Sequence, residues 1–435
     1  MVSVLQHGVH RLVETPGRLI YKSAPDFDIV ILACVLFLQR FYLGSSGISL
    51  DLFSVGLLFT YQFISGRLLI QYDRLVWFLS LGLAVTASLL LNFRSTMLVS
   101  YVVFMALYFL FTLSRPSTRD RYKRTLQGFQ FLVLILSCLA IGQFVAQFVV
   151  DGRQIIHFFG IIPDFLLPPE FTWGEDRRVA WNTIIPIMEG SSLIKSNGIF
   201  LVEPSTMSQM AALGILIEVL EFRRPRYFIL FGFGLLLSYS GTGLTILFLC
   251  LPLTGIVNRR AQIPALLVVI LILALLTSDI IDASAFTSRI GEFEDVNASG
   301  FGRFISSFWM AAQHLDAASP PVLVRGNGPA TMKEFVPHTY YLATGATWFK
   351  VLYEYGLIGA FLFPCFLYAC FRGSRCPKVV IAALMYYYIF TGDGLLSTPI
   401  LTIMVVLCTL SGPERRRGHI ERTAGPPSAL VPTAR

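Results

Sequence analysis

The sequence predicts an all-α protein that crosses a membrane many times. Hydrophobic residues make up 55% of its 435 residues and charged residues only 14%, whereas soluble domains carry about 25% charged residues. The charged residues also gather in short clusters, and the apolar runs between them approach the roughly 20 residues that a helix needs to cross a bilayer. Composition and pattern together indicate a polytopic helical membrane protein and argue against a soluble globular one.

Apolar runs divide the chain into about twelve expected transmembrane helices. They lie at 27–43, 48–64, 75–91, 97–113, 129–150, 198–220, 227–239, 241–257, 263–276, 346–371, 379–391 and 396–410. The two runs on either side of Ser240 are short, and the sequence leaves open whether they form a helical hairpin or one interrupted helix. Residues 27–411 are expected to form a single transmembrane domain.

Basic residues predict how these helices are oriented. If the N-terminus faces the cytoplasm, 23 of the 34 Lys and Arg residues lie in cytoplasmic segments and nine in outer segments, while Arg40 and Lys350 fall within spans. Short cytoplasmic loops are enriched in Lys and Arg, so both termini are expected in the cytoplasm. Residues 1–26 then form a cytoplasmic N-terminus, and 412–435 form a disordered basic tail that touches anionic lipid. The same bias explains the formal net charge of +8 without a nucleic-acid partner.

Two long polar stretches, 151–196 and 277–345, face outward in this arrangement. They mix acids, bases, histidines and aromatic residues, and loops of such length are usually functional or disordered. We therefore expect chemistry where 277–345 meets the lipid. The seven cysteines lie outside both stretches, and neither they nor the acidic residues show metal-site spacing. No metal or other cofactor is expected.

The first stretch that suggests chemistry runs from Lys195 to Ser205. Pro204 suits the first turn of a helix, and Glu203 precedes it at the positive end of the helix dipole. One interpretation is simply a helix start. The functional interpretation has Lys195 contact an anion and Glu203 act as an acid, a base or a hydroxyl binder, and it requires both side chains to face the outer loops.

The second stretch, 299–315, predicts an amphipathic helix that follows Gly302 and Arg303. Its apolar face recurs at Phe304, Phe308, Ala312 and Leu315, which is helical spacing. A helix of this kind can lie in the membrane interface. Arg303 is then either an anchor that reaches lipid phosphate or a contact for a substrate.

The third stretch runs from Arg325 to Gly359. Arg325-Gly-Asn-Gly328 is typical of an anion-binding turn. His338 has the chemistry of a general base for a hydroxyl, although a lone histidine is more often structural. Lys350 and Glu354 are one helical turn apart within a span, where they either neutralise each other or serve function. With Arg289 in the same outer loop, the cations Lys195, Arg289, Arg303, Arg325 and Lys350 are expected to bind an anionic, membrane-borne substrate.

The order of these motifs over 191–412 resembles that of the Wzy-type polysaccharide polymerases and O-antigen ligases. The resemblance rests on the blocks Gly198-Ile-Phe-Leu-Val-Glu203-Pro204-Ser205, Ser238-Tyr-Ser240-Gly241-Thr-Gly243, Gly302-Arg303 with Trp309, Arg325-Gly-Asn-Gly328, and His338 with Gly356-Leu-Ile-Gly359. The Glu-Pro-Ser and Ser-Gly-Thr-Gly forms look closest to exopolysaccharide polymerases of the xanthan type.

The resemblance implies a GT-C-like glycosyltransferase of the bacterial inner membrane that needs no metal. Its substrate would be an oligosaccharide linked to a polyprenyl diphosphate such as undecaprenyl diphosphate, which it would polymerise into an exported exopolysaccharide or O-antigen on the periplasmic side. Arg303 matches the arginine that holds the donor pyrophosphate, Lys195 stands where a second arginine is common, and His338 matches the residue that activates the acceptor hydroxyl. Thr339 after the histidine, and Gly356 eighteen residues beyond it, depart from the ligase pattern and favour a polymerase.

Three other functions stay open at this point. A ligase would transfer a finished glycan to an acceptor, a flippase or transporter would move a lipid-linked oligosaccharide, and a scaffold would only assemble a synthesis complex. Expected partners are membrane lipid, a chain-length regulator and other polysaccharide export proteins.

Overall fold

The computed structural model describes residues 26–44, 47–149, 163–166, 185–187, 191–257, 262–263, 266, 269–270, 291, 293–336, 339, 341–392 and 394–412. Several predicted features therefore lie outside the described residues: the N-terminus through residue 25, most of the outer stretch 151–196, most of the span 263–276, Arg289, His338 and the basic tail after residue 412.

The described chain is mostly helical, as predicted. Eleven of the twelve apolar segments form helices: α2 (Phe27–Phe37), α3 (Leu50–Ile64), α4 (Tyr72–Leu91), α5 (Met97–Phe109) continued by η3 (Leu110–Thr112), α6 (Arg119–Ala146), α8 (Pro204–Ile217) continued by η6 (Glu218–Phe222), α9 (Pro225–Leu237), α10 (Gly241–Val257), α17 (Thr347–Phe371), α18 (Lys378–Phe390) and α19 (Thr398–Met404) continued by η9 (Val405–Thr409). Among the described residues, α4, α6, α8 with η6, and α17 are long and apolar enough to cross a membrane.

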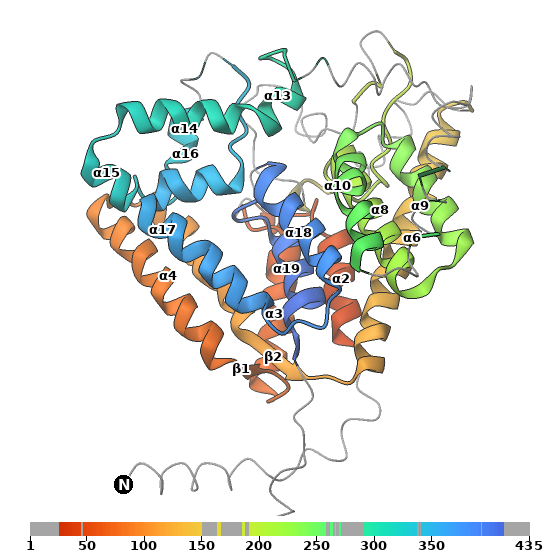
Figure 1. The fold of residues 1–435 in the computed structure, drawn as a ribbon, viewed down its shortest axis with the longest axis horizontal. Helices are drawn as coiled ribbons and strands as arrows, with labels where there is room; N and C mark the ends of the chain where they lie inside the picture. The colour runs from red at the N-terminus through yellow and green to blue at the C-terminus, as the bar shows by residue number, and fades with distance from the viewer. Residues whose placement is uncertain are drawn as a thin grey trace, which may run out of the picture.

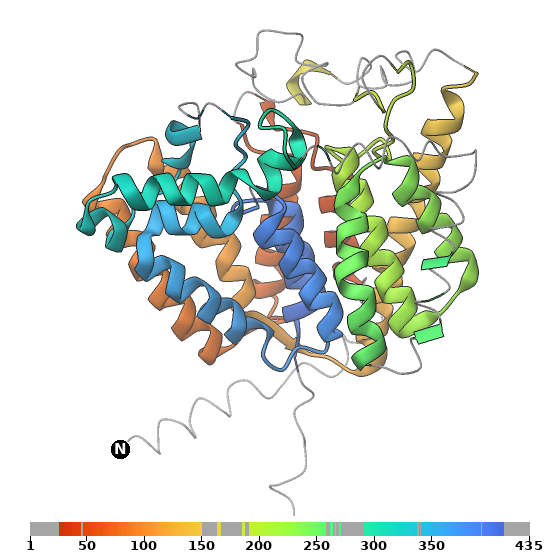
Figure 2. The same ribbon diagram turned by 45° about the horizontal axis from the view of Figure 1, so that its top comes forward.

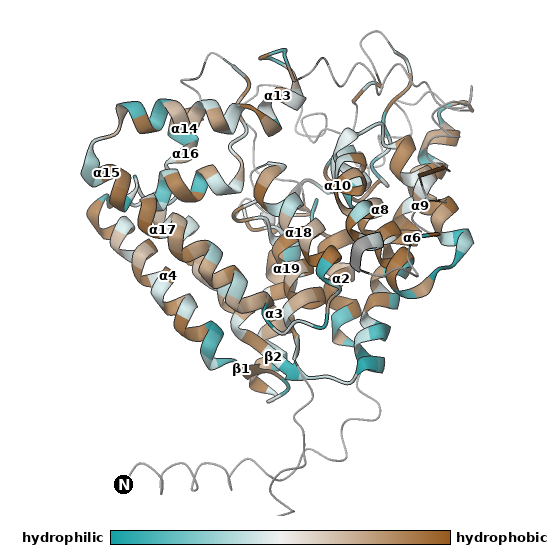
Figure 3. Cartoon of the chain, viewed as in Figure 1, coloured by the Kyte–Doolittle hydropathy of each residue, from teal (hydrophilic) through white to brown (hydrophobic). Residues whose placement is uncertain are grey.

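The remaining elements are short: η5 (Asp164–Leu166), α13 (Ser299–Phe304), α14 (Ser306–Ala317), α15 (Pro320–Arg325), α16 (Met332–Phe335), and the strands β1 (Leu69–Ile70), β2 (Leu113–Pro116) and β3 (Ser411–Gly412). The long helices run roughly side by side, with α4 and α17 at one edge of the molecule and α6, α8, α9 and α10 at the other (Figure 1). Helices α13 and α14 lie across one end of this bundle (Figure 2). Hydrophobic residues cover most of the helical surface, and hydrophilic ones gather on α4 and α6 near β1 and β2 (Figure 3).

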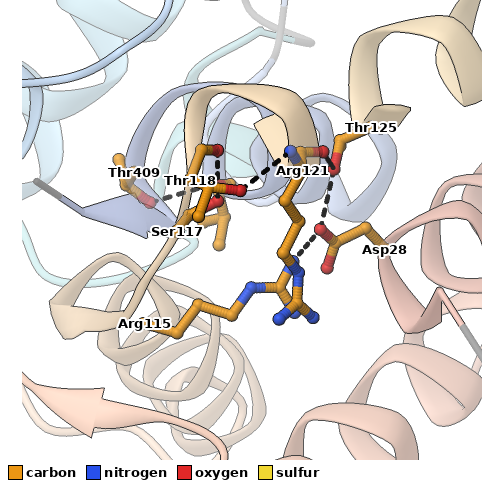
Figure 4. Close-up of polar contacts among 8 residues, drawn as sticks. Asp28, Arg115, Ser117, Thr118, Arg121, Thr125 and Thr409 are labelled. Atoms are coloured by element: carbon orange, nitrogen blue, oxygen red, sulfur yellow. Dashed lines mark hydrogen bonds and ion pairs between the residues drawn. The ribbon is translucent and has the colours of Figure 1, made fainter. Parts of the chain in front are cut away.

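At the strand end of the bundle, buried charges join distant segments. β2 pairs antiparallel with β1 and parallel with β3. Arg115 of β2 forms a buried ion pair with Asp28 of α2, and the Thr125 hydroxyl of α6 donates to the same carboxylate over 3.0 Å (Figure 4). Removing one partner of a buried pair typically costs about 3–5 kcal/mol, so this pair fixes β2 to α2, and the Thr125 hydrogen bond joins α6 to the same carboxylate.

Helix α17 is broken at Gly356, inside a segment that the sequence predicts as one continuous span. The backbone there has φ 64° and ψ −167°, a conformation open to glycine and strained for other residues. A Cβ at this position would also lie 2.3 Å from the carbonyl oxygen of Val324. The break therefore exists because α15 packs directly against the backbone of α17.

The predicted anion-binding turn fills that break. The Asn327 amide donates to the Tyr353 carbonyl over 3.0 Å, and the Gly328 amide donates to the Glu354 carbonyl over 2.9 Å. Carbonyls freed by a broken helix need such donors when water is absent. These two N–H groups are thus committed to α17 and are not offered to an anion, which gives the turn a structural role.

Candidate functional site

A cavity of about 510 Å³ lies where α8 and α10 begin, beside α13. Its walls are formed by Ile185, Lys195, Glu203, Pro204, Ser205, Tyr239, Ser240, Gly241, Thr242, Leu244, Thr245, Phe293, Ser299, Gly300, Arg303 and Phe304. Lys195, Glu203 and Arg303, three of the residues predicted to act on substrate, therefore face a common space. Lys195 and Glu203 share this cavity with α13, which belongs to the polar stretch 277–345; that this stretch faces outward stays a prediction.

An ion pair crosses this cavity. Arg303 Nη2 lies 2.8 Å from Glu203 Oε2, and the Ser205 hydroxyl donates to the same oxygen over 2.7 Å. The two charged side chains are 24% and 35% exposed, so solvent and solutes reach them. An anionic ligand that enters the cavity can therefore compete with Glu203 for Arg303.

The segment that carries Lys195 and Glu203 is held by amide side chains. Asn197 accepts from the Ile199 amide over 3.1 Å and donates to the Leu201 carbonyl over 2.9 Å. Gln143 of α6 accepts from the Asn197 amide over 3.0 Å. These bonds satisfy a buried, irregular backbone and fix the direction in which it enters α8. Helix α8 starts at Pro204, which confirms the predicted helix start.

A buried link from the first part of the chain supports the same segment. The Arg40 guanidinium donates to the Ile199 carbonyl over 2.8 Å across a sequence separation of 159 residues. Ile199 has φ 67°, a left-handed conformation that is uncommon for a residue other than glycine. The predicted span ending at residue 43 thus supplies a contact that stabilises this strained turn.

The turn at Ser240 forms another wall of the cavity. It also decides whether the apolar runs on either side of Ser240 form a helical hairpin or one interrupted helix. Tyr239 has φ 45°, which reverses the chain, so α9 and α10 are two separate helices and not one interrupted helix. The Ser208 hydroxyl donates to the Ser240 carbonyl and accepts from the Gly243 amide, both over 3.0 Å. Ser208 lies on α8, and these bonds hold the starts of α8 and α10 together.

The electrostatics of the cavity favour an anion. The N-terminal turns of α8 and α10 both line it, and a helix N-terminus carries the equivalent of about half a positive charge. Lys195 and Arg303 add two full charges, against the single carboxylate of Glu203. Ser205, Ser240 and Thr242 provide hydroxyl groups on the same walls. Phosphate oxygens are suited to this combination of guanidinium, ammonium, hydroxyl and backbone donors.

Two predicted contacts lie away from the cavity. Arg325 ends α15 beside the break in α17, and Lys350 is buried inside α17 at 4% exposure with Glu354 at 1%. Neither Arg325 nor Lys350 lines the cavity, and the pairing of Lys350 with Glu354 stays a prediction. Arg289 and His338 fall outside the described residues.

The sequence did not single out the hydroxyl-bearing wall. Ser240, Thr242 and Thr245 line the cavity, yet the Ser-Gly-Thr-Gly block entered the sequence analysis only through the family resemblance and was given no role in binding. The sequence feature that could have identified this wall is a cluster of small polar residues directly before an apolar helix. Such residues let another backbone approach closely.

The cavity contains cations and hydroxyls but no built metal site. Within the part of the chain that the structure describes, no three His, Cys, Asp or Glu side chains gather as metal ligands would. Comparisons with known proteins give no match to a family model, a curated protein or a solved structure.

Proposed function

We propose that this protein is a membrane glycosyltransferase that polymerises polyprenyl-diphosphate-linked oligosaccharide repeat units at the outer face of a bacterial inner membrane. One observation supports this proposal above all: Lys195, Glu203 and Arg303 meet in a single cavity with the N-termini of α8 and α10. A cationic cavity that also holds a carboxylate suits the transfer of a sugar from a diphosphate leaving group.

The main catalytic requirement of this reaction is to stabilise the negative charge that develops on the diphosphate leaving group. The acceptor hydroxyl oxygen attacks the anomeric carbon of the donor sugar, the bond from that carbon to the diphosphate oxygen breaks, and the polyprenyl diphosphate leaves with the bonding electrons. Arg303 and Lys195 would hold that diphosphate. Donors placed where charge develops typically contribute about 10²–10³ in rate each.

The proton of the acceptor hydroxyl requires a base, and Glu203 is the carboxylate in position. When a diphosphate takes over Arg303, the Glu203 carboxylate keeps the Ser205 hydroxyl as a partner and becomes free to accept a proton. His338 is the other base that the sequence offers. General base catalysis typically adds about 10²–10⁴ in rate.

A ligase would use the same donor chemistry, so the product must separate the two enzymes. A flippase requires a polar path through the bundle, whereas the charges of this cavity lie where α8 and α10 begin, beside α13. A scaffold would tolerate loss of the cavity charges.

The test is polymerisation by purified protein in detergent, given lipid-linked repeat units, a chelator and no nucleotide sugar. A ladder of lengthening products is the expected result. A product only when a separate acceptor is added would indicate the ligase. Movement of substrate across vesicles without any ladder would indicate the flippase, and no reaction in either format would remove the enzyme proposal.

A further inference from the structure

We propose that α14 lies in the outer interface of the bilayer, with the strip formed by Phe308, Ala312 and Leu315 in contact with lipid. The proposal concerns how one helix meets the membrane and does not depend on catalysis. It starts from the three distinct faces of this 12-residue helix.

The first face packs on the protein. Ser306, Met310 and His314 are buried with Ser307 and Ala311, and they point toward α17. Phe349 of α17 belongs to the same hydrophobic cluster as Met310, and the His314 ring lies 4.8 Å from that of Tyr353. This face fixes α14 across the start of α17.

The two outward faces differ in chemistry. Successive residues of an α-helix are rotated by about 100°, so Phe308, Ala312 and Leu315 fall within about 60° of one another. Gln313 and Asp316 fall on a neighbouring strip together with Trp309. Phe308 is 56% exposed and Leu315 50%. A helix with one face on protein, one apolar and one polar fits a position between protein, lipid and water.

Aromatic rings mark the level of this interface. The Phe308 ring lies 5.1 Å from that of Trp348, the second residue of α17, and the Trp309 ring lies 5.5 Å from that of Tyr341. Trp and Tyr are enriched where membrane helices leave the hydrocarbon for the headgroups. The rings therefore place α14 at the depth where α17 enters the bilayer.

Lipid is a better occupant for the strip than a second protein chain. Further along α17, Leu357 is 53% exposed and Phe361 67%, so this candidate membrane helix also presents apolar side chains outward. A stable protein interface buries about 800 Å² on each partner, and three side chains of one short helix cannot supply that area.

The placement has a consequence for the cavity. Arg303 ends α13, and only Ile305 separates α13 from α14. An α14 anchored in the interface holds the Arg303 guanidinium at the level of lipid phosphates. This consequence rests on the proposed function, because a lipid-linked diphosphate would present its charge at that depth. The lipid contact of α14 does not depend on the proposed function.

The experiment uses the full chain, depleted of its seven native cysteines and reconstituted in liposomes. Single cysteines at Phe308 and Leu315, and matched ones at Gln313 and Asp316, are labelled with an environment-sensitive fluorophore. Labels at 308 and 315 should emit at shorter wavelength and lose fluorescence to spin-labelled lipids, while labels at 313 and 316 should lose it to aqueous iodide. Equal quenching of all four by iodide would overturn the proposal.

A second measurement needs no substitution and no activity. The unmodified protein is irradiated in vesicles containing a lipid with a photoreactive group near its headgroup, and labelled peptides are mapped. Adducts on Phe308 or Leu315 support the proposal. Adducts on α17 but none on 306–317 contradict it.

Discussion

Arg303 and Glu203 are joined by a 2.8 Å contact although 100 residues separate them in the sequence. Glu203 stands at the start of α8 in the bundle, and Arg303 stands at the end of α13, which lies with α14 across one end of the bundle. The contact therefore makes one cavity from two parts of the chain. Because both side chains remain partly exposed, the pair can open without breaking the fold.

Arg303→Ala should remove most of the activity. The loss of a donor to the developing diphosphate charge typically lowers the turnover number by about 10²–10³. Arg303→Lys should recover part of this, because the ammonium keeps the charge but loses the two-pronged guanidinium geometry. The ladder assay gives both rates, and membrane yield of the protein should stay unchanged.

Arg94→Ala is the matched control for these variants. Arg94 also pairs with a glutamate, Glu334, and the two side chains are 57% and 58% exposed, but neither lines the cavity. Activity close to that of the unmodified protein is expected. Equal losses for Arg94→Ala and Arg303→Ala would mean that surface charge in general, and not the cavity, supports the reaction.

Glu203→Gln tests whether Glu203 acts as a catalytic base or only as a counterion for Arg303. The amide keeps the shape of the side chain and can still accept from Ser205, but it cannot take up a proton. The turnover number should fall by roughly 10²–10⁴, while KM for the lipid-linked donor should stay level or fall because a competing negative charge is gone. A raised KM with an unchanged turnover number would show that Glu203 only binds substrate.

Local sequence patterns predicted where helices begin better than they predicted which helices contact one another. Pro204 was predicted to open a helix and does so, because fixed φ and a missing N–H suit that position. The functional interpretation of the same stretch required Lys195 and Glu203 to face the polar loops, and both line the cavity beside α13. The sequence cannot show that Arg303 folds back onto Glu203, since that depends on how α13 packs over the bundle.

The dependence on tertiary packing also explains why the turn at 325–328, predicted to bind an anion, lies away from the cavity. Arg325-Gly-Asn-Gly328 has the composition of an anion-binding turn, and its amides instead bond to α17. Only the tertiary approach of α15 to Gly356 decides between these uses. Helix lengths were also harder to predict than helix positions: the apolar run 27–43 contains the 11-residue α2, because apolar composition alone does not show where a helix ends.

Gly243→Ala should destabilise the bundle at the cavity. A Cβ at Gly243 would lie 2.3 Å from both the carbonyl oxygen and the hydroxyl oxygen of Ser208, so α10 would have to move away from α8. Overpacking of this kind typically costs about 1–3 kcal/mol. The midpoint of thermal unfolding in detergent should fall.

Gly142→Ala in α6 is the comparison for that measurement. Nothing lies within 4 Å of a Cβ built there, and alanine favours a helix over glycine by roughly 0.5–1 kcal/mol. Its unfolding midpoint should be equal or higher. If both variants shift alike, the close approach of α8 and α10 at Ser208 is not what stabilises this region.

His314 should make the stability of the protein against unfolding depend on pH, because it packs α14 against α17. The side chain is buried at 4% exposure against Phe349 and Tyr353, and Nε2 has no hydrogen-bond partner within the part of the chain that the structure describes. Burial lowers the pKa of His314, whereas the unfolded chain titrates near 6.5. Below about pH 6.5 the unfolded state therefore binds a proton that the folded state resists.

Stability should accordingly be constant with respect to His314 above pH 6.5 and should fall as the pH drops from there toward the folded-state pKa. His314→Gln keeps a polar side chain but cannot titrate, so its unfolding midpoint should fall less between pH 7 and pH 5.5 than that of the unmodified protein. Carboxylates contribute to both curves equally, and their difference isolates the histidine. Parallel curves would mean that His314 is protonated as easily in the folded protein as in water, and that α14 does not bury it against α17.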